Sequence, residues 1–284
     1  MNLFTPILVT GTDARSYLQG QLTCDIDKLT RNNALLASCN SAQGRVQAVL
    51  TVIERTDGIV LLVVPEIAER TITRLRKYIL RSKVTIEDAS PRLNACGLTA
   101  QQLNQAGTAG LDTVSTHQQM GNGSVVRWHD TQIERYVLIA PSSVGVHPSL
   151  MRDEWLLCDI RAGLPHVFSE THETFVAQML NLDLLGGISF EKGCYTGQEI
   201  IARTHFRGTI KRRMNRFAAE CLPPAPGTRL SANGEPAGEV VYAVATGTGC
   251  ELLAVVPLTH TESLLALADS NLALSRLPMP YPIP

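Results

Sequence analysis

The amino-acid sequence predicts an α+β protein with two mixed units followed by a small antiparallel β-barrel. Apolar residues alternate at the period of a half-buried strand in several stretches and adopt helical spacing in a few others. A proline-rich segment at 223–227 is followed by short β-branched runs separated by glycine-containing turns, which is typical of a small barrel. The chain has 284 residues, enough for two or three units, and we place them at 1–92, 93–222 and 223–284.

Residues 1–92 are predicted to form a ferredoxin-like unit with antiparallel hairpins. Ala68, Ile72 and Leu75 fall on one face of a helix that has acidic residues at its start and basic residues at its end. The continuous apolar run at 58–64 is typical of a central strand. The expected elements are a helix at 14–19, a second helix after Pro65, and strands at 7–10, 35–39, 45–54, 58–64 and 84–87.

A second α+β unit of similar kind is predicted for residues 93–222, and the barrel for 223–284. Pro148 is expected to open a helix that runs through Trp155 and stops at Gly163. The other expected elements are a helix at 99–105, strands at 93–98, 124–129 and 135–140, and barrel strands at 237–245, 251–256 and 272–277.

The composition excludes several classes of protein. The formal net charge is −1 and 44% of the residues are hydrophobic, so global charge gives no sign of nucleic-acid binding. We find no signal peptide and no apolar run of about 18 residues, and we therefore expect a cytoplasmic protein without a membrane span. Seven widely spaced cysteines without a C-x-x-C pair argue against a disulfide framework and a zinc site, so we expect reduced thiols and no metal ion.

One cysteine lies in a stretch with distinctive chemistry. Residues 192–199 read K-G-C-Y-T-G-Q-E, in which Thr196 and Glu199 match a T-x-x-E capping box and predict a helix start at Thr196. Cys194 would then lie ahead of the positive end of a helix and beside Lys192. Both influences favour the thiolate, the form of cysteine that reacts or binds metal. The alternative is that Cys194 is a small buried hydrophobe.

The stretch that follows is basic. Residues 200–219 include no acidic residue, although such a run is often simply a solvated face. The functional alternative is a site for an anion such as a phosphate backbone, so an RNA-binding module is one hypothesis for this chain. The cations of this stretch are Arg203, Arg207, Lys211, Arg212, Arg213 and Arg216.

Several stretches together resemble one known family. The run K-G-C-Y-T-G-Q-E is preceded by L-G-G-I-S-F at 185–190 and followed by H-F-R-G at 205–208, and G-T-D-A-R-S-Y-L-Q-G-Q-L-T-C-D stands at 11–25. These motifs resemble the YgfZ family, a branch of the superfamily that includes the folate-dependent aminomethyltransferase (T-protein) of glycine cleavage. We call residues 185–208 the signature segment.

The resemblance implies three domains in a ring, in which two intertwined α+β units and a C-terminal barrel surround a reduced folate. Tetrahydrofolate, or a one-carbon-substituted form of it, is therefore the implied cofactor. The resemblance also implies a role in the assembly or repair of iron–sulfur clusters. The implied partners are iron–sulfur enzymes, and through them the chain would serve tRNA processing and modification.

Particular site residues also follow from the resemblance. Cys194 is the implied thiol centre, conditioned by Lys192 and the helix start. Trp155 aligns with a family tryptophan and Phe4 stands where some members have a second one, so both are expected to pack on the flat pterin. Core packing of an amphipathic helix is the alternative for Trp155. The anionic glutamate tail would meet cations drawn from Arg203, Arg207, Lys211 and Arg212.

One departure from the superfamily bears on catalysis. The aminomethyltransferase has an aspartate, required for transfer, in the strand that follows the first glycine turn. The matching stretch here, 44–50, has no carboxylate. We therefore expect no aminomethyl transfer and keep a folate-dependent one-carbon transferase as an alternative. The sequence leaves open whether the chain catalyses a defined reaction.

Overall fold

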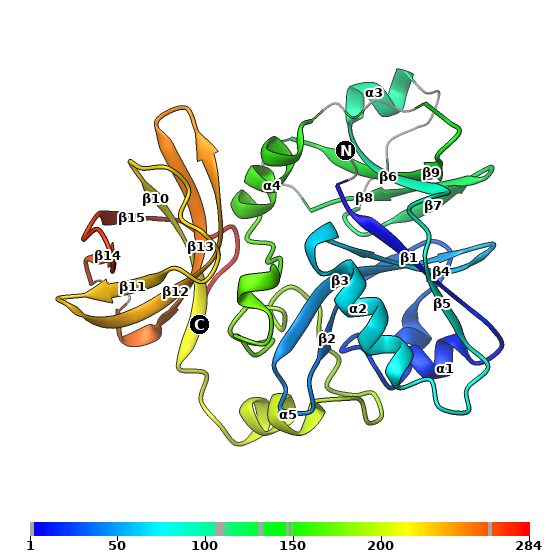
Figure 1. Cartoon of the computed structure of the whole chain (residues 1–284), viewed down its shortest axis with the longest axis horizontal. Helices are drawn as coiled ribbons and strands as arrows, with labels where there is room; N and C mark the ends of the chain where they lie inside the picture. Colours follow the sequence, from blue (N-terminus) through cyan, green and yellow to red (C-terminus); the bar gives the residue numbers. More distant parts are fainter. Residues whose placement is uncertain are drawn as a thin grey trace.

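The computed structural model describes residues 3–105, 111, 113–129, 133–145, 148, 150–260 and 263–284. Within these residues the strands form a five-stranded sheet, a four-stranded sheet and a closed six-stranded barrel (Figure 1). Short helices accompany the sheets, which confirms the predicted α+β class with a C-terminal barrel. No helix in the described ranges has both the length and the apolar character that crossing a membrane requires.

The first unit is a five-stranded antiparallel sheet in the order β2-β3-β4-β1-β5. The succession β1-α1-β3-β4-α2-β5 is ferredoxin-like, β2 adds an edge strand, and β4 is the middle strand, as its apolar run predicts. Ile67, Ile72 and Leu75 of α2 (Pro65–Lys77) are buried against the sheet. The other bounds are β1 Thr5–Thr10, α1 Ala14–Gln19, β2 Ala34–Asn40, β3 Val46–Arg55, β4 Gly58–Val63 and β5 Thr85–Asp88, with a 3₁₀ turn at Ile26–Lys28.

The second unit is a four-stranded antiparallel sheet in the order β6-β9-β8-β7. The sequence does not predict β7 (His117–Met120), because this mostly polar strand lacks apolar alternation. The helix expected to open at Pro148 begins instead at Arg152, where the Met151 N–H donates to the Glu154 carboxylate (2.7 Å) and closes the first turn. The other bounds are β6 Leu93–Thr99, α3 Ala100–Gln105, β8 Gly123–Arg127, β9 Arg135–Pro141 and α4 Arg152–Arg161, followed by a 3₁₀ turn at Ser169–Thr171.

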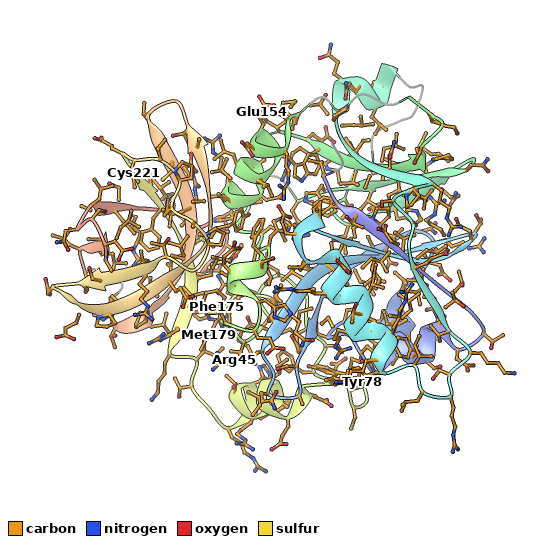
Figure 2. All side chains as sticks on the ribbon, in the orientation of Figure 1. Arg45, Tyr78, Glu154, Phe175, Met179 and Cys221 are labelled. Carbon is orange, nitrogen blue, oxygen red and sulfur yellow. The ribbon has the colours of Figure 1, made fainter. Side chains whose placement is uncertain are left out.

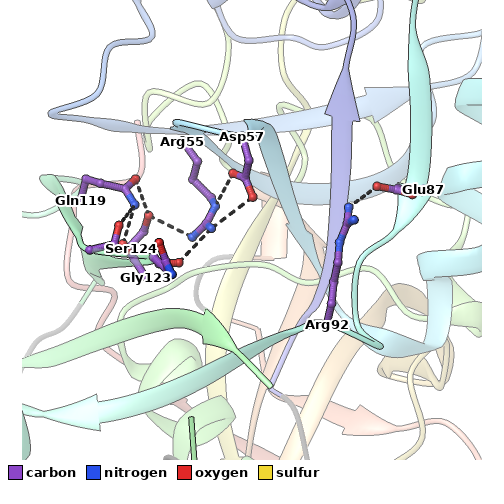
Figure 3. A network of polar contacts seen from close by, with 9 residues as sticks. Arg55, Asp57, Glu87, Arg92, Gln119, Gly123 and Ser124 are labelled. Carbon is purple, nitrogen blue, oxygen red and sulfur yellow. Dashed lines mark hydrogen bonds and ion pairs between the residues drawn. The ribbon is translucent and has the colours of Figure 1, made fainter. Parts of the chain in front are cut away.

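Direct contacts join the two α+β units around one shared core. The Leu3 N–H donates to the carbonyl oxygen of Ala95 (3.2 Å), so the N-terminal segment lies beside β6 of the second unit. The buried Arg55 guanidinium at the end of β3 donates to the Ser124 hydroxyl in β8 (3.2 Å), and Asp57 holds it in place (2.9 Å) (Figure 3). The two units are intertwined in this sense.

The chain between α4 and the barrel returns to the first unit. It includes α5 (Gln198–Phe206), which Figure 1 shows below β2 and β3. The Val46 N–H donates to the Phe175 carbonyl oxygen (2.8 Å), and the Ser189 N–H donates to the Thr23 carbonyl oxygen (2.9 Å). The signature segment therefore lies against the first unit, although it follows the second unit in sequence.

The barrel closes in the order β10-β13-β12-β11-β14-β15. Its first strand, β10 (Arg212–Ala219), pairs with β13 along its whole length, so the predicted barrel segment 223–284 omits one strand. The arginines of β10 predict a surface stretch, which is why the sequence gives no sign of this strand. The other bounds are β11 Arg229–Ala232, β12 Glu235–Thr246, β13 Gly249–Pro257, β14 Leu265–Leu267 and β15 Ala273–Leu277, with a 3₁₀ turn at Leu258–His260.

Strands β12 and β13 carry buried apolar residues on both of their faces. Val240 and Leu252 belong to the barrel's own core. Val241 and Leu253 belong to the main core, where β12 and β13 contact α4. The barrel therefore packs against the α+β units through β12 and β13, and it shares their core.

Candidate functional site at the signature segment

Lys192 anchors the signature segment to the first unit. Its ammonium donates hydrogen bonds to the carbonyl oxygens of Leu22 (3.0 Å) and Cys24 (2.6 Å), and it lies 5.1 Å from the centre of the Tyr195 ring. Burial lowers the pKa of Lys192 to about 8, and nearby acidic groups oppose this shift in part. In the described residues Lys192 makes no hydrogen bond to Cys194, because its side chain points into the protein.

Cys194 is the one exposed thiol among the seven cysteines, all of which lie in described residues. Its exposure excludes the alternative of a buried hydrophobe. The other thiols are buried or partly buried, and burial raises the pKa of Cys24 to about 12 and also raises the pKa of Cys39 and Cys96. Because the thiolate is the reactive form and must be accessible, Cys194 is the thiol best placed to react.

The helix after Cys194 starts later than predicted, and the predicted capping box is wrong. α5 begins at Gln198 with Gly197 as its N-cap. The Thr196 hydroxyl donates to the Gly20 carbonyl oxygen (3.5 Å), and the Glu199 carboxylate pairs with an arginine one turn further along the helix (2.5 Å). Cys194 therefore does not stand directly ahead of the helix start.

Two glycines bring the β2–β3 turn against the start of α5. Gly197 has φ +83°, and a Cβ added to it would lie 2.6 Å from the Ser41 carbonyl oxygen and 3.0 Å from the Gly44 Cα. Gly44 has φ +71°, and its added Cβ would lie 2.8 Å from the Cβ of Ile200. Gly193, by contrast, has no heavy atom within 4 Å of the corresponding position. Gly197 thus serves close packing, and only Gly193 leaves open space beside Cys194.

A cleft of about 520 Å³ lies between the signature segment and residues 24–28. The rings of Phe190 and His205 line it and stack with centroids 3.7 Å apart, and the Phe206 ring meets both at a steep angle. Phe206 is 67% exposed, which is unusual for a large apolar side chain. Asp25 also lines the cleft, and a hydrogen bond from a neighbouring amide lowers its pKa. The volume is typical of small-molecule sites, which span about 300–1,000 Å³.

The cations of the basic segment divide into two groups. Arg213 is buried and pairs with Asp183 (2.6 Å), and Arg216 pairs with Glu251 (2.9 Å). These two arginines therefore stabilise the barrel and its attachment to the segment that precedes it. The other four remain on the surface, where a role in binding an anion stays a prediction. They are Arg203, Arg207, Lys211 and Arg212.

The geometry at Trp155 does not fit a stacked pterin. The side chain is fully buried, the Arg135 guanidinium carbon lies 4.4 Å from the ring centre, and a Cβ added to Gly97 would lie 2.5 Å from the ring. The indole Nε1 has no hydrogen-bond partner among the described residues, but the enclosed ring offers no open face to a ligand. Trp155 packs the core, which is the alternative raised by its helical position.

Phe4 is enclosed in the same core. Its ring centre lies 4.9 Å from that of Trp128 and 5.8 Å from that of His166. The cavity beside these three rings has about 10 Å³, room for about one water molecule and not for a pterin. Figure 1 also shows α4, which carries Trp155, well apart from α5, so the predicted aromatic pair and the predicted cations do not form one site.

A buried ionic cluster under α4 is not predicted from the sequence. Asp159 accepts hydrogen bonds from Arg135 (2.9 Å) and the Trp128 indole (3.0 Å), and its other oxygen lies 2.8 Å from His166 Nε2. Burial alone would raise the pKa of Asp159, but Arg135 and His166 hold it below its usual value. The one local sign is a charged residue, Arg135, at the head of an apolar strand. The cluster holds α4 against the second sheet.

A carboxylate from a distant part of the chain reaches the start of β3. Glu173 accepts a hydrogen bond from the Gln47 side-chain amide (2.6 Å), and Gln47 Oε1 accepts one from Arg74 (3.0 Å). Glu173 is 126 residues from Gln47 in sequence, so no local pattern could have indicated this contact. The carboxylate is bound to a neutral amide, and β3 itself carries none at this end.

The comparisons with known proteins support the fold. No family model matches the sequence. Among solved structures, the chain is similar to the glycine cleavage system aminomethyltransferase T from Bartonella henselae, with a TM-score of 0.76 and 17% sequence identity. The match covers 98% of this chain and 84% of that chain. At this identity the likeness concerns the fold and not the activity, and the chain has the fold of aminomethyltransferase T.

Proposed function

We propose that this chain is a folate-binding protein related to the YgfZ family, and that it supports the assembly or repair of iron–sulfur clusters in partner enzymes. Through those enzymes it would serve tRNA modification in the cytoplasm. One observation carries the proposal. The signature segment, held by the buried Lys192, presents Cys194 to solvent as the one exposed thiol among the seven cysteines, all of which the structure describes.

An exposed cysteine on an anchored turn suits this work. Thiolates are the usual protein ligands of iron–sulfur clusters, and an accessible thiolate also attacks disulfide sulfur. The described residues contain no group of three or more His, Cys, Asp or Glu that could hold a metal ion. Because a cluster takes about four protein ligands, we propose that Cys194 acts together with the ligands of a partner enzyme and not as a resident metal site.

We propose that the folate binds in the cleft beside the signature segment, since Trp155 and Phe4 are closed to it. The stacked pair Phe190 and His205, with the exposed Phe206, gives a planar π-system an aromatic wall. Asp25 gives the cleft a carboxylate that can accept hydrogen bonds from the amino and ring N–H groups of a pterin. The exposed cations that follow Phe206 in the chain suit the glutamate tail.

The proposal does not extend to aminomethyl transfer. β3 begins without a carboxylate at Val46 and Gln47, and Glu173 reaches that place only through a neutral amide. A general base must reach the proton that it abstracts. Turnover of an aminomethyl donor by the purified protein would establish the transferase alternative.

A second candidate function is RNA binding by the basic segment. Arg207 and Lys211 are exposed and make no ion pair within the described part of the chain. Phe206 beside them offers a surface on which a base could stack. RNA affinity that falls steeply with added salt and survives Cys194→Ala would support this candidate over the thiol-centred one.

Calorimetric titration with tetrahydrofolate tests the folate proposal. We expect saturable binding by the wild type and by Leu264→Ala, a control that removes another exposed apolar side chain in the barrel. Phe206→Ala should bind several-fold more weakly, since an aromatic contact contributes about 0.5–1.5 kcal/mol. Absence of binding to the wild type would overturn the folate proposal, and equal affinity of Phe206→Ala would overturn its placement in the cleft.

A further inference from the structure

Cys221 and Cys250 lie beside each other at one end of the barrel. Their sulfur atoms are 3.9 Å apart, and no other pair of the seven cysteines, all of them described, has sulfur atoms in contact. Cys250 is the second residue of β13 and is paired with Ala219, the last residue of β10. Cys221 follows two residues later and packs against the barrel core to which Cys250 belongs.

We propose that Cys221 and Cys250 are a redox-modification site that closes to a reversible disulfide under peroxide. A disulfide requires a sulfur–sulfur distance of about 2.05 Å, so the two sulfur atoms need to approach by only about 2 Å. Cys221 lies between β10 and β11, outside any strand or helix, beside the 88% exposed Leu222. It can therefore move toward Cys250 without breaking a strand pairing.

The two thiols differ in exposure, and this difference predicts which of them reacts first. Cys250 is 1% exposed, and burial together with the neighbouring Cys221 raises its pKa to about 12. Cys221 is only partly buried, so it meets an oxidant first. A groove of about 660 Å³ lies on the Cys250 side of the pair, where Arg161 and Arg216 also line it. Figure 2 shows Cys221 on the barrel side of the molecule, away from Tyr78 of the first unit.

The reaction balances with a peroxide as the oxidant. The Cys221 thiolate attacks one peroxide oxygen, the O–O bond breaks, and the departing hydroxide takes a proton to become water. The resulting sulfenic acid is then attacked by the Cys250 sulfur, which loses its proton, and the S–O bond breaks to release a second water. Together the two thiols lose two electrons and two protons to one hydrogen peroxide. A dithiol reductant reverses the reaction by thiol–disulfide exchange.

The disulfide would cross-link the end of β10 to the start of β13. It would close the loop of residues 221–250, which contains β11 and β12. Restricting the unfolded chain in this way stabilises the folded state, so the oxidised protein should melt at a higher temperature than the reduced protein.

Peptide mass spectrometry of the full-length protein tests the proposal. Reduced protein is treated with hydrogen peroxide, unfolded in N-ethylmaleimide and digested. We expect one cross-linked peptide pair that contains Cys221 and Cys250, is lighter by two hydrogens, and disappears after dithiothreitol. The five remaining cysteines give no mutual cross-link.

The variant Cys250→Ser provides the matched control, because it keeps Cys221 and removes its partner. It should lose the cross-link and the rise in melting temperature and accumulate oxidised Cys221. The proposal is overturned if wild-type Cys221 and Cys250 are recovered as N-ethylmaleimide adducts after peroxide, or if Cys221 proceeds to the sulfinic acid with Cys250 still free. The wild-type result decides the matter even if the variant does not fold.

Discussion

The ammonium of Lys192 donates a 2.6 Å hydrogen bond to the carbonyl oxygen of Cys24, a residue 168 positions earlier in the chain. With the second bond, to Leu22, it ties the signature segment to the loop after α1. The lysine that stands two residues before Cys194 is therefore an anchor of the turn. Cys194 is exposed on the same turn because Lys192 and Tyr195 face inward on either side of it.

Lys192→Met should destabilise the protein by about 1–3 kcal/mol, because methionine fills the space but leaves two buried carbonyl oxygens without their donor. Urea unfolding followed by circular dichroism measures the change. Lys211→Met is the control at an exposed lysine and should shift the free energy of unfolding by less than about 0.5 kcal/mol. If Lys192→Met leaves stability unchanged and alters only the alkylation rate of Cys194, the anchoring role is wrong and direct conditioning of the thiol is right.

The buried amine of Lys192 should also give a characteristic pH dependence. Burial lowers its pKa from the usual 10.5 to about 8 in the folded protein. Between these values the unfolded chain holds a proton that the folded chain has released, so this group makes the free energy of unfolding rise with pH across that window. The difference in unfolding free energy between wild type and Lys192→Met should therefore widen as the pH rises from about 8 to about 10.5. Urea unfolding of both proteins on each side measures it, and a constant gap would contradict the assignment.

Gly197→Ala should cost about 1–3 kcal/mol of stability, because alanine is strained at φ +83° and its Cβ would press on the Ser41 carbonyl oxygen. Gly193→Ala lies in the same segment and meets no heavy atom within 4 Å, so we expect a change within about 0.5 kcal/mol. Thermal unfolding of the two variants beside the wild type measures the difference. Equal melting temperatures for the two variants would show that the β2–β3 turn does not press on the start of α5.

Asp159→Asn should destabilise the protein by about 3 kcal/mol or more, because it leaves the fully buried Arg135 without its counter-charge. Asp153→Asn, at the exposed start of the same helix, is the control and should cost less than about 1 kcal/mol. Chemical denaturation measures both. A small effect at Asp159 would mean that the cluster is not needed to hold α4 against the second sheet.

Local sequence patterns predict much of the fold. The apolar run of β4 predicts the central strand, and the spacing of Ile72 and Leu75 predicts the buried face of α2. Short β-branched runs after the proline-rich segment predict the barrel. These elements are predictable because each one buries a face whose period is visible within a few residues.

The features that escape the sequence depend on partners far along the chain. The arginines of β10 make this strand look like a surface stretch in the sequence. Only the folded chain brings Arg213 to Asp183 and Arg216 to Glu251. The wrong helix start at Thr196 has a similar cause, since packing against the β2–β3 turn overrides the local capping signal.

The candidate site is predicted in part. The distinctive stretch around Cys194 is visible in sequence, and the exposure of its thiol agrees with a functional role. The aromatic residues assigned to the pterin are not exposed. Sequence could not show this, because a tryptophan on an amphipathic helix has the same spacing whether it packs against a core or a ligand. Trp155 and Phe4 are buried together, whereas the open aromatic surface belongs to Phe206.

The most direct test of the central claim is a timed alkylation of the reduced native protein with a small excess of iodoacetamide at neutral pH, with each thiol followed by peptide mass spectrometry. We expect Cys194 to be modified first and well ahead of the other six, because it combines exposure with an anchored turn. If any of the other six is modified as fast as Cys194, the signature segment does not present a distinct thiol centre, and the proposed role in iron–sulfur maintenance loses its chemical basis.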